Sequence, residues 1–190
     1  MSNKETSLKE KLRQALASTV KVISDDLKLD QKKNNKSSSQ FDFFELDNLN
    51  TKNDFIKARA VSDSAALKKK FSDELIYKKN LPTNSSCKSL YAIAEKIRYE
   101  ALGGKMLKGI EKNFKENYSQ MINFKRKDQI KSRDDVEINE AFELYMLKNF
   151  HNLKLNDLCS KILSFWEKDL DQSINKHINF LKENLENQNI

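Results

Sequence analysis

The chain has 190 residues, of which 38% are hydrophobic and 33% charged, and its formal net charge is +7. A chain of this length buries roughly 70% of the surface its unfolded form exposes, so one domain over residues 1–190 is expected. Three glycines and one proline predict long helices joined by short polar turns. Apolar runs fall short of the ~18 residues that a membrane span needs, and residues 1–10 lack the apolar stretch of a secretory signal. A cytoplasmic protein without membrane contact is therefore expected.

The first predicted helix follows a capping box. Ser7 and Glu10 have the required spacing, and apolar residues recur behind them at helical spacing until about Asp25. The next helix is expected to begin at Ser62 as the N-cap, with Asp63 in its first turn, where a carboxylate favours the helix dipole.

The segment between these helices is irregular. Residues 31–39 form a polar low-complexity stretch, which predicts a mobile loop. The aromatic run at residues 41–46 suits a strand better than a helix. A small β-hairpin near residues 27–48 is therefore left open.

Two further helices, at residues 86–102 and 106–118, occupy the centre of the chain. Apolar residues fall on one face of the first. Gly103 is expected to end that helix by turning with a positive φ. Gly109 lies on the edge of the second helix's apolar face, and it is expected to let the two helices approach closely.

The remaining sequence predicts further helices after a basic turn at residues 125–133. Asp134 or Asp135 can cap a helix that runs past Tyr145. Apolar residues at helical spacing mark another around residues 155–166 and a last one over residues 170–185. The predicted fold is mainly α, with six to seven helices and no internal repeat.

The sequence offers no catalytic constellation. It has no phosphate-binding GxxxxGK[ST] loop, so the chain alone is expected to hydrolyse no ATP. Cys87 and Cys159 are isolated, which predicts reduced thiols. His151 and His177 have no zinc-site spacing, so a surface histidine is favoured over a site shared by His151 and Cys159. We expect no catalytic residue, no metal site and no bound cofactor in this chain.

Basic residues gather in three short clusters, at residues 68–70, 78–79 and 125–127. A nucleic-acid-binding protein presents such residues as a patch. Acidic residues are interspersed with the basic ones, and the only tryptophan, Trp166, falls in a helical pattern. The sequence therefore favours solvated helix faces. A basic helical module that binds nucleic acid or an acidic protein partner is the alternative.

A motif runs from one central helix into the other. It reads Ala94-Glu95-Lys96-Ile97-Arg98-Tyr99-Glu100-Ala101-Leu102-Gly103, followed by Met106, Gly109 and Asn113. This pattern, including the spacing between its two glycines, is similar to a signature of the T subunit of aerobic cobaltochelatase (CobT). The upstream segment Arg59-Ala60-Val61-Ser62-Asp63-Ser64-Ala65-Ala66-Leu67 looks like a second segment of that family. The resemblance covers about residues 8–185.

The resemblance implies a helical amino-terminal domain that serves assembly and coupling. The family works with an AAA+ ATPase subunit and a large tetrapyrrole-binding subunit. Using ATP, Mg and cobalt, the complex inserts cobalt into hydrogenobyrinic acid a,c-diamide in cobalamin biosynthesis. The family's carboxy-terminal von Willebrand-type metal-adhesion domain is not in these residues, which suggests a fragment or a shortened relative. A homo-oligomer is left open.

Arg98 and Glu100 border the apolar stripe of the central helix on opposite sides. Such positions reach neighbouring elements while their stems stay packed. One interpretation is that both build the fold through buried or half-buried ion pairs. The other is that one of them contacts a partner subunit, because a desolvated arginine is a frequent interface anchor. The candidate partner-binding or structural motif consists of Arg59, Asp63, Arg98, Glu100, Gly103 and Gly109.

Overall fold

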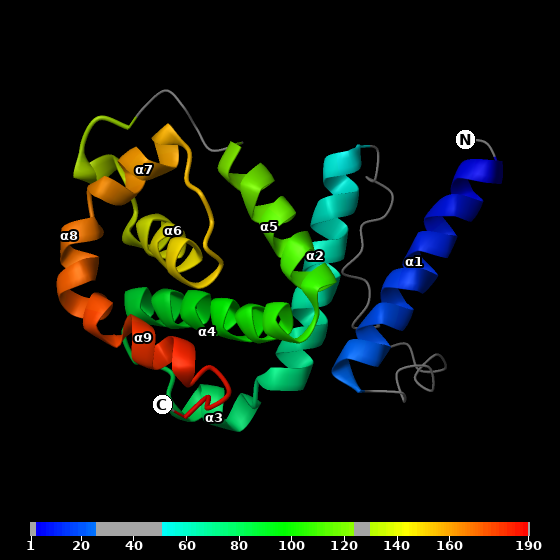
Figure 1. Ribbon diagram of the computed structural model, residues 1–190, viewed down its shortest axis with the longest axis horizontal. Helices are drawn as coiled ribbons and strands as arrows, with labels where there is room; N and C mark the ends of the chain where they lie inside the picture. Colours follow the sequence, from blue (N-terminus) through cyan, green and yellow to red (C-terminus); the bar gives the residue numbers. More distant parts are fainter. Residues whose placement is uncertain (1–2, 26–50, 124–129, 190) are drawn as a thin grey trace. The chain divides into compact units, whose positions relative to one another are not determined.

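The structure is a computed structural model that describes residues 3–25, 51–123 and 130–189 (Figure 1). Every regular element in these residues is a helix, which confirms the mainly α fold. The loop predicted at residues 31–39 and the hairpin considered near residues 27–48 lie outside the described residues. The chain divides into two compact units, Met1–Lys70 and Phe71–Ile190.

The first unit contains α1 (Asn3–Ser24) and nearly all of α2 (Lys52–Phe71). Because α1 begins at Asn3, the predicted N-cap at Ser7 is wrong. The predicted N-cap at Ser62 is also wrong, since Ser62 lies in the middle of α2 and is fully buried.

The cap of α2 lies eleven residues before the predicted one, at Thr51. The backbone N–H of Asp54 donates to Thr51 Oγ1 (3.3 Å), and the N–H of Thr51 donates to Asp54 Oδ2 (2.7 Å). This is a reciprocal arrangement like a capping box, with an aspartate in the place of the usual glutamate.

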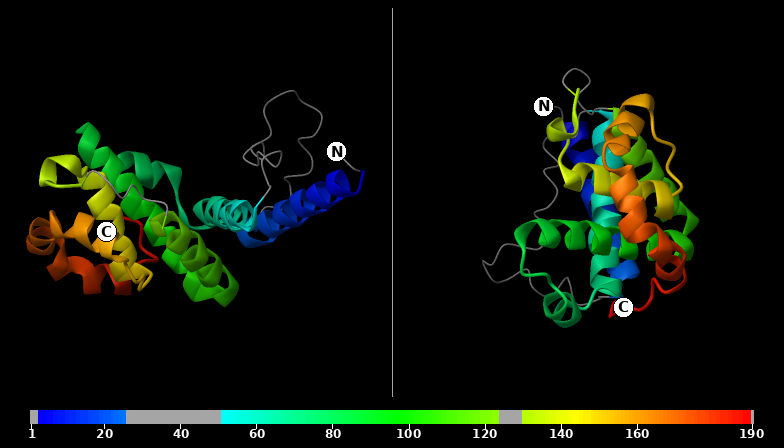
Figure 2. Two further views of the ribbon diagram at one scale, coloured as in Figure 1. Left: turned by 90° about the horizontal axis from the view of Figure 1, so that it is seen from above. Right: turned by 90° about the vertical axis from the view of Figure 1, so that its left-hand side faces the viewer.

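The second unit is built around the long helix α4. Its helical segments are α3 (Glu74–Lys79), α4 (Ser85–Met106), α5 (Lys108–Asn123), the 3₁₀ turn η3 (Arg133–Asp135), α6 (Ile138–Phe150), α7 (Asp157–Ser164), α8 (Glu167–Leu170), the π-helical turn η4 (Asp171–Asn175) and α9 (Lys176–Glu183). Helix α4 packs against α5 and α6, and α6 also packs against α7 and α8 (Figure 1). Figure 2 shows these helices from two further directions.

The start of α4 was predicted to within about two residues. Its N-cap is Asn84, whose side chain accepts from the backbone N–H groups of Ser86 (2.9 Å) and Cys87 (3.3 Å). The end was predicted wrongly, because α4 continues through Gly103 to Met106, and no described glycine has a positive φ. Glycine permits a left-handed turn but does not force one, and here Gly103 is buried within the helix.

Helix α5 buries four residues at a spacing of one turn, Ile110, Phe114, Tyr118 and Ile122. The close-packing role predicted for Gly109 is wrong, because a Cβ at that exposed position would meet nothing within 4 Å. The close approach of the two helices lies instead at Gly104, five residues before Gly109. A Cβ on Gly104 would lie 3.4 Å from the Cβ of Glu111.

The helices after α5 differ from prediction mainly at their ends. Asp134 and Asp135 belong to the turn η3, so neither caps α6, whose N-cap is Glu137. The single helix predicted over residues 170–185 is a succession of α8, η4 and α9. Beyond α9, Leu185 returns to the core and packs with Ala101 and Leu102.

Candidate functional site

The six motif residues predicted from the sequence occupy three helices. Arg59 and Asp63 lie on α2 in the first unit, where Arg59 is exposed and Asp63 is buried. The other four lie in the second unit, on α4 and α5: Arg98, Glu100, Gly103 and Gly109. Of these four, Arg98 and Glu100 make the polar contacts described below.

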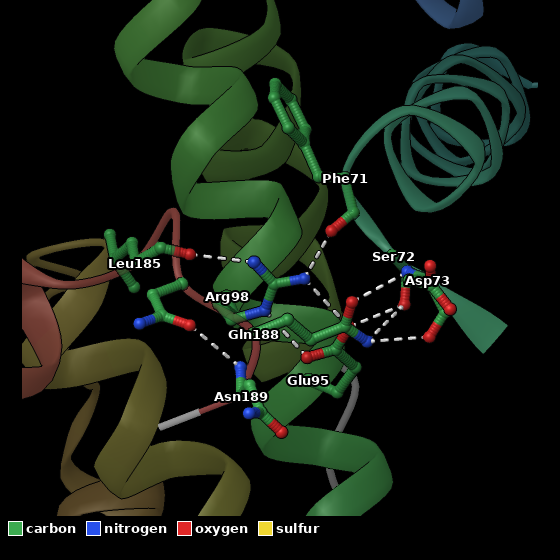
Figure 3. Close-up of polar contacts among 9 residues, drawn as sticks. Phe71, Ser72, Asp73, Glu95, Arg98, Leu185, Gln188 and Asn189 are labelled. Atoms are coloured by element: carbon green, nitrogen blue, oxygen red, sulfur yellow. Dashed lines mark hydrogen bonds and ion pairs between the residues drawn. The ribbon is translucent and has the colours of Figure 1, made fainter. Parts of the chain in front are cut away.

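Arg98 forms a two-pronged ion pair with Glu95, one turn earlier on α4 (Figure 3). Its Nε donates to Glu95 Oε2 (2.7 Å), and its Nη2 donates to Glu95 Oε1 (2.9 Å). The arginine side chain is only 13% exposed and the glutamate side chain 7%. A bidentate pair of this kind is stronger and more directional than a single charged hydrogen bond.

The remaining donors of Arg98 reach two backbone carbonyls far away in the sequence. Nη1 donates to the carbonyl of Leu185 (2.7 Å), and Nη2 donates to that of Phe71 (2.5 Å) (Figure 3). Phe71 is the first residue of the second unit, and Leu185 lies beyond α9. Arg98 therefore holds both ends of this unit against α4.

Glu95 accepts two further hydrogen bonds on the oxygen Oε1. The donors are Ser72 Oγ (2.5 Å) and Gln188 Nε2 (3.0 Å). Gln188 also accepts from the backbone N–H of Asp73 (2.6 Å) and donates to the Asp73 carbonyl (3.1 Å). Figure 3 shows these side chains converging on α4 from the two chain segments. The buried carboxylate is thus surrounded by donors, as a buried charge requires.

Glu100 lies on another face of α4 and is 1% exposed. Tyr118 on α5 donates its hydroxyl to Glu100 Oε2 (2.5 Å). Burial, reinforced by the neighbouring carboxylate of Glu100, raises the pKa of Tyr118 well above its usual range. Tyr118 therefore stays a donor, and this hydrogen bond links α4 to α5 inside the core.

His151 was predicted to be a surface residue, and this prediction is wrong because the residue is 4% exposed. It is the C-cap of α6, where its backbone N–H donates to the carbonyl of Leu147 (3.1 Å). Its ring packs against Phe114 and Tyr118, at centroid distances of 6.2 and 5.7 Å. Burial lowers the pKa of His151 to about 4, so the ring is neutral at pH 7.

Neither cysteine forms a disulfide bond, and Cys87 is exposed whereas Cys159 is buried. Within residues 3–25, 51–123 and 130–189, no group of three or more His, Cys, Asp or Glu side chains is arranged to hold a metal ion. No helix in the same ranges is long and apolar enough to cross a membrane.

Three side chains of the Arg98 network were not among the residues predicted from the sequence: Glu95, Ser72 and Gln188. Glu95 could have been found, since residues three apart on a helix are neighbours and carry opposite charges here. Ser72 and Gln188 carry no such signal. Gln188 lies 93 positions from Glu95, and only the folded chain brings the two together.

Glu95, Arg98 and Glu100 of the central motif therefore serve the interior of the second unit. A protein-family model described as "Cobalamin biosynthesis protein CobT" matches residues 6–190 of the chain. The comparisons with curated proteins and with solved structures gave no match.

Proposed function

We propose that this chain, which belongs to the cobalamin biosynthesis protein CobT family, is a non-catalytic assembly and coupling subunit of an ATP-dependent cobaltochelatase. The family implies involvement in cobalamin biosynthesis. The observation that carries the more specific proposal is the extent of the family match, which covers nearly all of the chain.

In this proposal an AAA+ ATPase subunit supplies the energy and a large subunit holds the tetrapyrrole. ATP, Mg and the cobalt to be inserted bind to those partners. The second unit of this chain contributes a rigid helical body against which the partners assemble. Support for a rigid body comes from the network of Arg98 and Glu95, which fastens both ends of the second unit to α4.

Partner contacts in this proposal fall on side chains that the fold leaves exposed. Several large apolar residues of the second unit lie at the surface: Leu75, Met106, Leu107 and Phe180. Leu75 is the most exposed at 79%, and its helix α3 buries no residue. Apolar side chains gain the most from burial in an interface because water leaves their surface.

The test is a titration of the purified chain with the AAA+ subunit of the same chelatase at increasing salt. We expect saturable binding that persists at high salt, since apolar contacts are not screened. A parallel titration with generic duplex DNA tests the alternative function, a basic helical module that binds nucleic acid. Binding to DNA that falls steeply with salt, as counterion release requires, together with no binding to the AAA+ subunit, would contradict the proposal.

A further inference from the structure

A cleft of about 310 Å³ opens between α4, α5, α6 and α9, entirely within the second unit. Its volume lies at the lower end of the range of small-molecule sites. Part of its wall is apolar and comes from Ala101, Phe150 and Leu185. Ala101 and Leu185 belong to one core cluster, against which Phe150 packs, so this wall is firmly held.

Two lysines give the cleft a positive charge. Lys105, at the end of α4, donates through Nζ to the carbonyl of Lys182 (3.2 Å), which leaves two of its three N–H donors for other acceptors. Lys182, on α9, places Nζ 5.9 Å from the ring centroid of Phe150. In the part of the chain that the structure describes, neither lysine forms an ion pair with a carboxylate.

The other titratable groups of the cleft leave it positively charged. The carboxylate of Glu111 also lines the cleft and stays ionised, because its ion pair with Lys115 (2.6 Å) lowers its pKa, and the ammonium of Lys115 balances its negative charge. His151 is buried and neutral at pH 7. The net charge that a ligand meets is therefore that of the two lysines.

An amide side chain at the rim adds a hydrogen-bond donor. Asn152 follows α6 with a positive φ of 50°, and its exposed side chain lines the cleft. Ammonium and amide N–H groups donate hydrogen bonds to carboxylate oxygens. Two cations beside an apolar wall suit an anion that has a hydrocarbon body.

We propose that this cleft binds a small organic dicarboxylate. Its two carboxylates pair with Lys105 and Lys182, and its methylene groups lie against Phe150 and Leu185. Inorganic phosphate could satisfy the charges but not the apolar wall, so the site should prefer the organic acid. The proposal is independent of the chelatase assignment.

The test is an NMR titration of the whole chain with glutarate, followed through the backbone amide signals of residues 101–105 and 149–152. We expect saturable shifts confined to these segments and to α9. Lys105→Gln and Lys182→Gln should each weaken binding about tenfold, which is the effect of one charged hydrogen bond. Lys176→Gln is the matched control, because Lys176 is an exposed lysine of the same helix as Lys182 and does not line the cleft.

Thermal melting of each variant verifies that the fold is kept, so that a loss of binding can be assigned to the cleft. Three results would overturn the proposal. They are an absence of saturable shifts, equal affinity of the lysine variants and the wild-type chain, and binding of inorganic phosphate as tight as that of glutarate.

Discussion

Arg98 donates to two kinds of acceptor at once, a carboxylate on its own helix and two carbonyls from opposite ends of the second unit. A residue that bridges distant segments in this way contributes strongly to stability, because its removal leaves several buried hydrogen-bond partners unsatisfied at once. Of the two interpretations raised by the sequence, these contacts support the structural one for Arg98.

Replacing Arg98 with alanine should therefore destabilise the protein. Breaking a fully buried pair typically costs ~3–5 kcal/mol, and the 13% exposure of Arg98 places the expected loss near the lower end. Chemical denaturation of Arg98→Ala measures the loss directly. Arg98→Lys, which keeps the charge but not the planar fork, should recover only part of it.

A double-mutant cycle provides the control for this interpretation. If Glu95 and Arg98 act as a pair, Glu95→Ala combined with Arg98→Ala should cost clearly less than the two single losses added together. Strictly additive losses would show that the two residues do not act as a pair. Unchanged melting of Arg98→Ala combined with weaker binding to a partner subunit would show that Arg98 is an interface residue.

His151 gives the protein a specific pH dependence. The unfolded chain takes up a proton on this residue as the pH falls through about 6.5, whereas the folded chain does so only near pH 4. The stability that depends on a neutral His151 is thus present above pH 6.5 and is lost as the pH falls towards 4. The difference amounts to about 3 kcal/mol.

His151→Leu removes this titration, so its free energy of unfolding should fall less steeply between pH 7 and pH 4 than that of the wild-type chain. The quantity compared is the slope of the free energy of unfolding against pH. A loss of stability that the substitution causes equally at every pH does not change this slope. His177→Gln is the matched control, because His177 is exposed and should leave the slope unchanged. Parallel curves for His151→Leu and wild type would contradict the assignment of a buried neutral imidazole.

At the scale of the elements, residues 184–189, which follow α9, form a segment that is fastened to α4 and is called the strap below. Leu185 packs in the core, and Gln188 makes hydrogen bonds with Ser72, Asp73 and Glu95. No helix includes residues 184–189. Their path is defined by side-chain contacts, by the Leu185 carbonyl, which accepts from Arg98 (2.7 Å), and by a turn in which the N–H of Asn187 donates to the carbonyl of Asn184 (3.0 Å). The strap should loosen before the helices do.

Gln188→Ala should release the strap while α4 keeps the pair between Arg98 and Glu95. We expect the free energy of unfolding to fall by about 1–2 kcal/mol. Hydrogen exchange at residues 184–189 should become faster than in the wild-type chain, while exchange in α4 changes less. Glu186→Gln, an exposed change in the same segment, is the control and should alter neither. Unchanged exchange in Gln188→Ala would indicate that the packing of Leu185 and its hydrogen bond with Arg98 hold the strap without Gln188.

Hydrophobic periodicity predicted the helices whose buried faces are made of large apolar residues. Helix α5 is the clearest example, since it buries Ile110, Phe114, Tyr118 and Ile122, although it covers Lys108–Asn123 and not the predicted residues 106–118. The first half of α2 shows no such periodicity. That helix buries Ala60, Ser62 and Asp63, which are small or polar residues that no apolar pattern reveals.

The candidate site could be predicted only where its partners are close in the sequence. Arg98 was recognised as a residue at the border of the apolar face, and its neighbour Glu95 could be inferred from helical spacing. The contacts to Phe71, Leu185 and Gln188 depend on chain segments that meet only in the folded state. Gly103 and Gly109 were given conformational roles that glycine allows but that packing in this molecule does not use.

For the whole molecule, the net charge of +7 bears on association more than on the fold. Several of its charges are paired along exposed helix faces, for example Lys78 with Glu74 and Lys115 with Glu111. Such pairs contribute little to stability, and they support solvated faces over a dedicated nucleic-acid-binding surface. The assembly proposal therefore rests on the family match and on the exposed apolar residues.

Reconstitution of cobalt insertion from purified subunits tests this proposal most directly. The rate of cobalt incorporation into the corrin substrate would be measured with the AAA+ subunit and the large subunit, in the presence and absence of this chain. We predict ATP-dependent insertion only when the chain is present, and no ATP hydrolysis by the chain alone. Equal insertion rates with and without the chain would contradict the account.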